Sequence, residues 1–572
     1  MDEAILSSVA GSIIENLGSA AFEQVGSLWN VEDDLEQIRK TVSTIKAVLL
    51  DAAEEQNHNH QDRVWLEKLK EAVFDADDLL DESKYYTELA LRQKEKSGSF
   101  TEKVRYFLSL ISVVFGRPKM SLKISQLSQE LDAIAKDREK FHWKERSTVK
   151  RIVSPKLIAG SDCRLDYLDE KTRHVSFSSY SFFAKTLNLV KASSKLRTIL
   201  FTHDQYAFDA MDESTLITLI ESFPRLRALD LHALNIKIMP NSIGKLIHLK
   251  YLDLSFNPIE TLPDSITTLL NLQTLKLQEC KYLEQLPRDI TKLVSLRHLD
   301  DRGCFELRLP QGLQKLTGLQ SLPLFIVRNN CGLGELNGLN NLKGTLEIII
   351  SEQLEDANSN CKVKNLREKQ HLEKLKLTLA HKEGHDEMLL DSLQPHPNLK
   401  ILEVWSYTGV TFSSWLFSIE NLVKITLRSC DRCNHLPPFS KLPFLERLWL
   451  DAMKDLECLS DRDISEEVST LSFFPSLKSL YIGNCPNLKG WWRSASMTDH
   501  QQHQHNRSLP SFPCLSDFWI VNCPNMTSMP LFPYLEEDLN LSNGLDYLCE
   551  EEQGVSVRDQ EEARGAFQDW EE

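Results

Sequence analysis

The sequence predicts an α + α/β solenoid architecture, in which an N-terminal four-helix bundle is followed by a horseshoe of short repeated units. Two patterns carry this prediction. Apolar residues recur every three or four positions through about the first 145 residues, which is the spacing of amphipathic helices. Leucines then recur with a period of 23 or 24 residues, which indicates a stacked repeat.

Four segments of the N-terminal part are expected to be helical: residues 3–25, 31–49, 62–93 and 120–141. The second shows the pattern most clearly, since its apolar residues follow one another at steps of three or four. They are Val31, Leu35, Ile38, Val42, Ile45 and Leu49. Amphipathic helices joined by short connections bury their apolar faces together. We therefore assign residues 1–145 to a four-helix bundle.

The repeat has the template Leu-x-x-Leu-x-Leu-x-x-(Asn/Cys), followed by an apolar residue, a Leu-Pro pair and a closing apolar residue. Its first leucine falls at Leu226, Leu249, Leu272, Leu296 and Leu319, and its proline at Pro240, Pro263, Pro287 and Pro310. Less regular copies continue toward Leu515. This is a leucine-rich repeat, in which each unit contributes one strand whose leucines are buried when neighbours stack.

These patterns set the domain boundaries that we expect. Residues 146–195 form a linker, residues 196–545 the leucine-rich-repeat domain, and residues 546–572 a tail. The tail from residue 549 onward holds nine acidic and two basic side chains, which repel one another, and we expect it to be disordered.

Composition limits the classes of function. A net charge of −17 argues against general nucleic-acid binding, because neutralising phosphates needs a basic surface. No run of about 18 apolar residues would span a membrane, and the N-terminal Met-Asp-Glu is unlike a secretory signal. We expect a cytoplasmic protein whose cysteines are reduced.

Five cysteines occupy the position of the template that Asn257 fills in one repeat. They are Cys280, Cys304, Cys430, Cys485 and Cys523, and free cysteine behaves there as a small buried hydrophobe. A metal site built on Cys430, Cys433 and His435 lacks a second ligand pair at finger spacing, so we expect no metal. Asp301 breaks the template, because it stands where a leucine should be buried. Either it is paired or the strand bulges there.

Side chains that flank the inward leucines of each strand must lie on the concave face of the repeats. The later repeats place aromatic and arginine side chains there, the usual anchors of protein interfaces. The predicted ligand face comprises Trp405, Arg428, Arg447, Trp449, Tyr481 and Trp519. The alternative is that each ring merely covers the neighbouring strands.

The N-terminal segment contains the motif Asp77-Asp78-Leu79-Leu80-Asp81, preceded by Val64-Trp65-Leu66 and Ala72-Val73-Phe74. This resembles the acidic motif of the Rx-type coiled-coil domain that opens plant intracellular immune receptors of the coiled-coil NLR class. The resemblance implies that Asp77, Asp78 and Asp81 contact a basic surface of the repeats. On charge alone, a solvated helix face fits as well.

The central nucleotide-binding domain of that family, NB-ARC, has no counterpart here. The P-loop spacing Gly-x-x-x-x-Gly-Lys-(Ser/Thr) is approached only at Gly244-Lys245, where Met239 replaces the first glycine and Leu246 follows. About fifty residues separate Trp143 from the first repeats. We expect no cofactor, because the family's ADP/ATP site is missing from this chain.

The resemblance implies a disease resistance function in plant defence, with repeats that bind a pathogen effector or a host guardee protein. The bundle would signal or pair with full-length NLR receptors, and the segment 3–25 implies membrane association only after oligomerisation. Without the switch domain, a decoy, an adaptor or a nonfunctional product is the alternative. No paired nucleophile and base indicates an enzyme. An extracellular receptor would need a signal and cysteine-capped ends, and the helical unit is too long for an F-box adaptor.

Overall fold

The computed structural model describes residues 2–54, 60–95, 120–134, 136, 157–158, 172–177, 183, 195–201, 210–328, 331–350, 366–379, 386–439, 442–460, 474–492, 512–526 and 538–542. The chain divides into two compact units, Met1–Leu275 and Lys276–Glu572. The predicted tail over 546–572 and most of the predicted linker lie outside the described residues.

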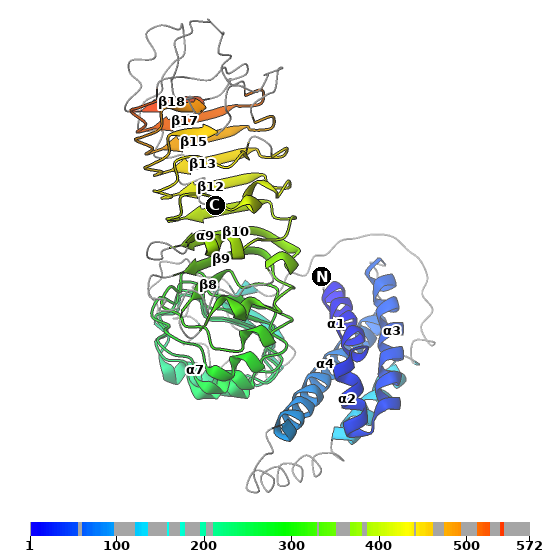
Figure 1. Cartoon of the computed structure of the whole chain (residues 1–572). Helices are drawn as coiled ribbons and strands as arrows, with labels where there is room; N and C mark the ends of the chain where they lie inside the picture. Colours follow the sequence, from blue (N-terminus) through cyan, green and yellow to red (C-terminus); the bar gives the residue numbers. More distant parts are fainter. Residues whose placement is uncertain are drawn as a thin grey trace, which may run out of the picture. The chain divides into compact units, whose positions relative to one another are not determined.

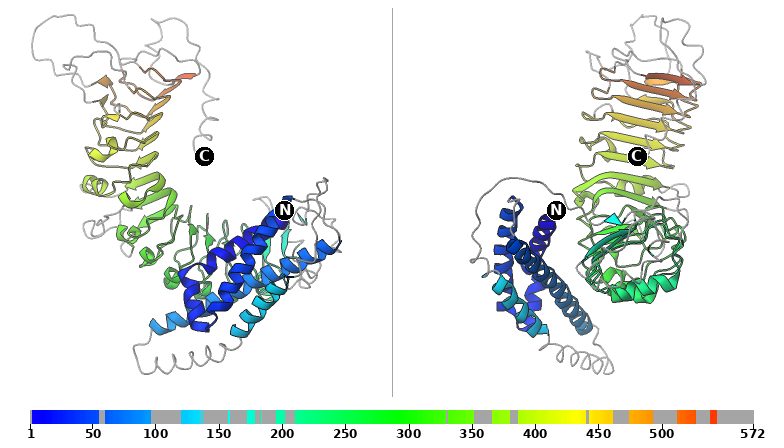
Figure 2. Two further views of the ribbon diagram at one scale, coloured as in Figure 1. Left: turned by 90° about the vertical axis from the view of Figure 1, so that its right-hand side faces the viewer. Right: turned by 180° about the vertical axis from the view of Figure 1, so that it is seen from behind.

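The first unit begins with the helices α1 (Asp2–Leu17), α2 (Ala20–Trp29), α3 (Glu32–Glu54) and α4 (His60–Glu95), and residues 120–134 are also helical. Both views in Figure 2 show the long blue helices side by side. The segment predicted as one helix over 3–25 is divided, because Ser19 adopts an extended conformation after Gly18. A second turn follows at Asn30, whose left-handed φ of 56° ends α2.

The helices share one apolar core, to which residues of α1 to α4 and of the 120–134 segment contribute. Its fully buried members include Ile13, Ile38, Val42, Leu69, Val73, Ile124 and Leu131. Two tryptophans combine burial with a satisfied indole N–H. Trp29 donates to the Thr87 hydroxyl at 2.8 Å, and Trp65 donates to the Ile134 carbonyl at 2.9 Å.

Short parallel strands follow in the first unit. They are β1 (Leu157–Ile158), β2 (His174–Phe177), β3 (Thr198–Phe201), β4 (Ala228–Asp230) and β5 (Tyr251–Asp253), each paired with the next in chain order. Helix α7 (Glu213–Ser222) lies between β3 and β4 in the sequence, and β6 (Thr274–Lys276) spans the boundary between the units. The predicted leucines Leu226, Leu249 and Leu272 are fully buried.

Three of the four registered prolines directly precede short 3-10 helices. Pro240, Pro263 and Pro287 immediately precede η2 (Asn241–Lys245), η3 (Asp264–Thr268) and η4 (Arg288–Lys292), because the fixed φ of proline suits the residue before such a turn. The apolar residue that the template places after each proline, for example Ile243, is fully buried. Gly244 lies in η2, where an added Cβ would meet the Ser265 carbonyl oxygen at 2.8 Å. Close packing of neighbouring turns therefore explains this glycine.

The second unit continues with β7 (His298–Asp300), η5 (Leu313–Lys315) and a nine-stranded parallel sheet (Figure 1). The strands of that sheet are β8 (Leu324–Val327), β9 (Lys343–Ile350), β10 (His371–Leu379), β11 (Ile401–Trp405), β12 (Lys424–Arg428), β13 (Arg447–Asp451), β15 (Ser479–Gly483), β17 (Asp517–Val521) and β18 (Asp538–Ser542). A separate parallel pair comprises β14 (Cys458–Ser460) and β16 (Gly490–Trp492). The connections carry η6 (Leu333–Leu336), η7 (Leu366–Glu368), α9 (Asp386–Ser392) and η8 (Ser414–Phe417).

The predicted ladder of asparagine and cysteine is present. Asn257 donates to the carbonyls of Leu231 and Leu254 and accepts from the N–H groups of Leu234 and Ile236, all within 3.1 Å. All five ladder cysteines are buried and lie outside any disulfide, and the Cys304 thiol donates to a backbone carbonyl at 2.9 Å. The side chain at the ladder position, Asn257 or a cysteine, thus joins neighbouring repeats through backbone groups that the turn leaves unpaired.

Asp301 is buried, with 2% of its surface exposed, and strand β7 ends one residue before it. Its carboxyl accepts a hydrogen bond from the Leu324 N–H at 3.0 Å. Burial raises the pKa of Asp301 well above its ordinary value, so the neutral acid is favoured. Asp301 is therefore paired with a backbone N–H group. It lies between β7, the last strand of one sheet, and β8, the first strand of the next sheet.

Candidate functional site: an acidic helix face and an aromatic strand face

The acidic motif lies in the middle of α4, which the bundle core fixes in place. Ala76 and Leu80 pack into that core, and the carboxylates of Asp77, Asp78 and Asp81 lie on another face of the helix. Asp77 and Asp81 are one helical turn apart and so share that face. All three side chains are buried, with 4 to 7% of each residue exposed.

Four cations of the same unit occupy one repeated position, immediately before a strand. Arg173 precedes β2, Arg197 precedes β3, Arg227 precedes β4 and Lys250 precedes β5. Because the strands pair in register, these residues follow one another at the strand spacing of about 4.8 Å. One turn of an α-helix rises about 5.4 Å, so the spacing of these cations is close to the rise of one turn of α4.

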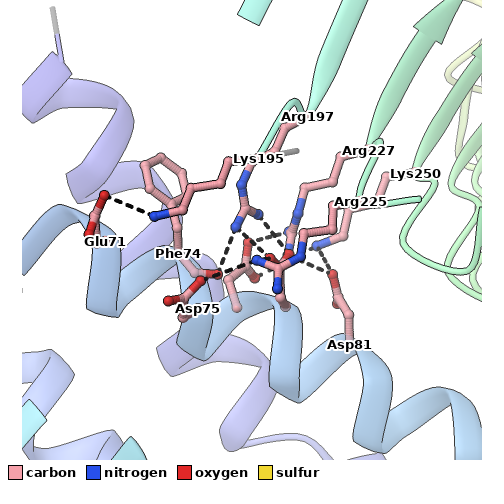
Figure 3. A network of polar contacts seen from close by, with 11 residues as sticks. Glu71, Phe74, Asp75, Asp81, Lys195, Arg197, Arg225, Arg227 and Lys250 are labelled. Carbon is pink, nitrogen blue, oxygen red and sulfur yellow. Dashed lines mark hydrogen bonds and ion pairs between the residues drawn. The ribbon is translucent and has the colours of Figure 1, made fainter. Parts of the chain in front are cut away.

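The ion pairs converge on the acidic motif (Figure 3). Arg197 binds Asp78 through two hydrogen bonds of 2.8 and 2.6 Å and also donates to the Phe74 carbonyl. Arg227 contacts all three carboxylates, with distances of 2.8 Å to Asp78 and 3.1 Å to Asp81. Lys250 lies 3.2 Å from Asp81. We call these six residues the acidic clamp: Asp77, Asp78, Asp81, Arg197, Arg227 and Lys250.

Further contacts surround the clamp. Arg225 lies 3.5 Å from Asp75, and Lys195 lies 3.0 Å from Glu71. The guanidinium of Arg173 lies 4.4 Å from the centre of the Phe74 ring, within the range of a cation–π contact. The clamp is therefore the buried centre of a wider polar contact between α4 and the first strands.

The clamp shifts the acid–base properties of its members. Burial alone would raise the pKa of Asp78, but attraction to Arg197 and Arg227 outweighs it, and the pKa is lowered. Burial lowers the pKa of Arg197 to about 10, although Asp78 opposes this. The pKa of Arg227 is raised, since the three carboxylates outweigh its loss of hydration. Asp78, Arg197 and Arg227 are therefore charged at neutral pH, and both arginines bind Asp78.

The sequence left open whether Asp77, Asp78 and Asp81 face solvent or a basic surface, and the structure places them against basic side chains. Sequence reasoning missed the partners Arg197, Arg227 and Lys250. A signal for them exists, because a basic residue precedes each of four successive strands. The longer step between Arg197 and Arg227 interrupts the repeat period and obscures this signal. Whether the motif signals, as the resemblance implies, stays a prediction.

In the second unit, the six residues of the predicted ligand face lie where strand alternation places them. Trp449 pairs in register with Tyr481, and Tyr481 with Trp519. The rings of Trp449 and Tyr481 stack, with centroids 3.7 Å apart and planes at 13°. Tyr481 is buried, whereas Trp449 and Trp519 are half-buried. Stacking thus accounts for part of this aromatic surface, and its role in binding stays a prediction.

The other predicted residues of this face carry charge beside an indole. Trp405 is in register with Arg428, whose guanidinium lies 5.2 Å from the indole centroid, and the Lys376 ammonium lies 3.6 Å from it. Arg428 also lies 3.3 Å from a carboxylate oxygen of Asp451. Arg447 is exposed at the start of β13. Aromatic and charged groups alternate on this face.

Two other kinds of candidate site are a metal site and a groove. Among the described residues, no group of three or more His, Cys, Asp or Glu side chains is arranged to hold a metal ion. A groove of about 1000 Å³ lies beside the N-terminal ends of β9 to β13 and is lined by residues such as Lys343, Lys400 and Phe444. It includes none of the six residues of the predicted ligand face.

Two family models match the chain. The leucine-rich repeat region matches residues 207–502, more than half of the chain. The chain belongs to the leucine-rich-repeat family. The Rx N-terminal domain matches residues 9–106, which contain the acidic motif, so this leucine-rich-repeat protein also carries the N-terminal domain that the motif predicted.

Its relatives include disease resistance proteins from Solanum bulbocastanum. RGA4 is 38% identical over 293 residues, which are 50% of this chain and 29% of RGA4. RGA2 is 34% identical over 284 residues, which are 47% of this chain and 29% of RGA2. The chain thus spans less than a third of the length of these relatives.

Proposed function

We propose that this leucine-rich-repeat protein is an intracellular, cytoplasmic immune-receptor-like protein of plant defence. Its later repeats bind a pathogen effector or a host guardee protein, and its Rx-type helical domain signals or pairs with a full-length receptor. The proposal includes a four-helix bundle, in which α1 and α2 together form the first helix, and a horseshoe of repeats. Neither family model describes an enzyme, which supports a binding role.

The acidic clamp is the observation that carries the proposal. An Rx-type motif and the repeats that follow it are linked by buried, charge-assisted hydrogen bonds, which are stronger than contacts between neutral groups. A partner bound to the repeats then acts on the helical domain through the strands that begin directly after Arg197 and Arg227. The relatives named as disease resistance proteins support the same biological setting.

A decoy or adaptor is the second candidate function. The P-loop spacing is absent from the sequence, and Gly244, the nearest approach to it, packs against a neighbouring turn. Such a chain would capture a partner or pair with a receptor without exchanging nucleotide. Within the described helices, none combines the length and apolar character needed to cross a bilayer.

Co-purification from plant leaves tests the proposal. We expect the tagged chain to retain a full-length NLR receptor or a defence-related protein partner. Trp449→Ala with Trp519→Ala should abolish capture through the repeats and leave the circular dichroism spectrum unchanged. Retention of the defence-related partner by this variant would show that the concave face is misassigned, whereas a receptor paired with the helical domain should stay bound. Tight binding of ATP by the purified chain would contradict the expected absence of a cofactor.

A further inference from the structure

Three basic side chains lie in one row across the concave face of the second unit, and a buried carboxylate lies beside this row. Lys374 on β10, Lys424 on β12 and Arg447 on β13 occupy the same register position, with Ile401 of β11 between the first two. Glu403 on β11 is buried and lies 2.8 Å from the Lys374 ammonium. Strand alternation directs all four charged side chains to one face of the sheet.

The charges of this cluster do not balance. Three cations face Glu403 and also Asp517, which stands at the same register position two strands from Arg447, and this leaves one positive charge in excess. Burial lowers the pKa of Lys424, and repulsion from Lys374 and Arg447 lowers it further, whereas Glu403 raises it. Arg447 is exposed to solvent. An anion placed beside Arg447 would relieve repulsion that the cluster already contains.

The aromatic surface begins at the edge of this cluster. Trp449 lies two residues after Arg447 on the same strand, so both side chains are on the same face. Its ring stacks on Tyr481, and Trp519 follows on β17. The half-buried Trp449 and Trp519 thus form an apolar area next to a positive one, over strands that lie in order in Figure 1.

Carboxylates limit the size of the anion that this face accepts. Asp451 ends β13 beside Arg428, and Asp517 begins β17 at the register position of Arg447. A long polyanion, such as a nucleic acid, would run from the basic cluster onto these carboxylates and be repelled. A short acidic stretch would not.

We infer that the concave face over β10 to β17 binds an acidic segment of a protein partner that carries a large apolar side chain beside its carboxylates. The carboxylates contact Lys424 and Arg447, and the apolar side chain packs against Trp449 and Trp519. This inference rests on the proposed function in that the repeats capture a protein, and it names the chemistry of that protein.

Binding of short labelled peptides to the purified full chain tests the inference by fluorescence anisotropy. The probes are a glutamate-rich peptide with one central tryptophan, the same peptide with alanine for tryptophan, and a lysine-rich peptide with the tryptophan. We expect the glutamate-rich peptide with tryptophan to have the highest affinity and the lysine-rich peptide the lowest. The affinity of the glutamate-rich peptide should fall as the salt concentration rises.

Two variants locate the site. Lys424→Glu with Arg447→Glu should lower the affinity for the glutamate-rich tryptophan peptide by about tenfold or more, since two charge contacts are reversed. Lys454→Glu with Lys489→Glu makes the same change of net charge at exposed positions outside the strands, and should have little effect. Trp519→Ala should lower the affinity for the acidic tryptophan peptide and leave the affinity for the acidic alanine peptide unchanged.

Several results would overturn the inference. They are equal binding of acidic and lysine-rich peptides, equal losses in the two charge variants, and equal losses of both acidic peptides in Trp519→Ala. Tighter peptide binding by a chain shortened to residue 548 would assign the face to the protein's own acidic residues 549–572 instead of a partner. None of these readouts depends on a receptor or on defence signalling, so failure of the proposed function alone would leave the peptide results intact.

Discussion

Replacing Arg227 with alanine should release the acidic motif from the strands that bind it. The Arg227 side chain is 13% exposed and is shared by Asp77, Asp78 and Asp81. Removing one member of a buried ion pair typically costs about 3–5 kcal/mol, because the remaining charges are left without a counterion. We therefore expect Arg227→Ala to weaken the contact by about 3 kcal/mol, or roughly a hundredfold in the association constant.

Arg225 provides the matched control. It is also an arginine beside Asp78, at 3.6 Å, but its side chain is 45% exposed. Exposed ion pairs contribute about 0–1 kcal/mol, since water and salt screen them. Arg225→Ala should therefore weaken the contact by less than about fivefold.

The assay uses a protease site inserted between the helical residues 120–134 and β1. After cleavage, the dissociation constant of the two fragments is measured by analytical ultracentrifugation. Near-native circular dichroism of each fragment controls for loss of folding. Equal effects of Arg225→Ala and Arg227→Ala, or no effect of the latter, would refute the view that the buried network holds the motif.

Two further predictions concern buried titratable groups in the repeats. Asp301→Asn keeps an acceptor for the Leu324 N–H but carries no charge. Because the folded pKa of Asp301 is raised, its burial costs stability as pH rises above the ordinary value of about 4, so the variant should be more stable in urea at neutral pH and equal to the wild type near pH 3. An equal gain at both pH values would contradict this. Lys369 is fully buried, donates to the carbonyls of Leu336 and Leu339, and has a pKa lowered by burial to about 8. The free energy of unfolding should therefore rise between pH 8 and 10.5, and Lys369→Met should remove that part of the rise; an identical pH dependence in the variant would contradict it.

The regular repeats were the easiest part of the fold to predict. Three of the four template prolines directly precede a 3-10 helix, and each registered leucine is buried, because period and turn chemistry are local properties of the sequence. The division of the first helix after Gly18 was missed. Its apolar residues keep a helical spacing across the break, so periodicity alone does not reveal it.

The candidate sites were predicted in part. Strand alternation correctly placed Trp449, Tyr481 and Trp519 side by side, but the stacking of the rings depends on side-chain packing that the pattern does not contain. Asp78 was singled out only through the family motif. Its partner Arg197 lies 119 residues away, and their contact depends on where a helix lies against strand ends. Local sequence rules do not determine that placement.

A double-mutant cycle on Asp78 and Arg197 is the most direct test of the claim that the repeats hold the acidic motif. The fragment dissociation constant would be measured for Asp78→Ala, Arg197→Ala and the double variant. The bidentate contact, with hydrogen bonds of 2.8 and 2.6 Å, predicts a coupling free energy of about 2 kcal/mol. The second substitution should therefore reduce the free energy of association far less once the first is made. Additive losses, with a coupling near zero, would contradict the account.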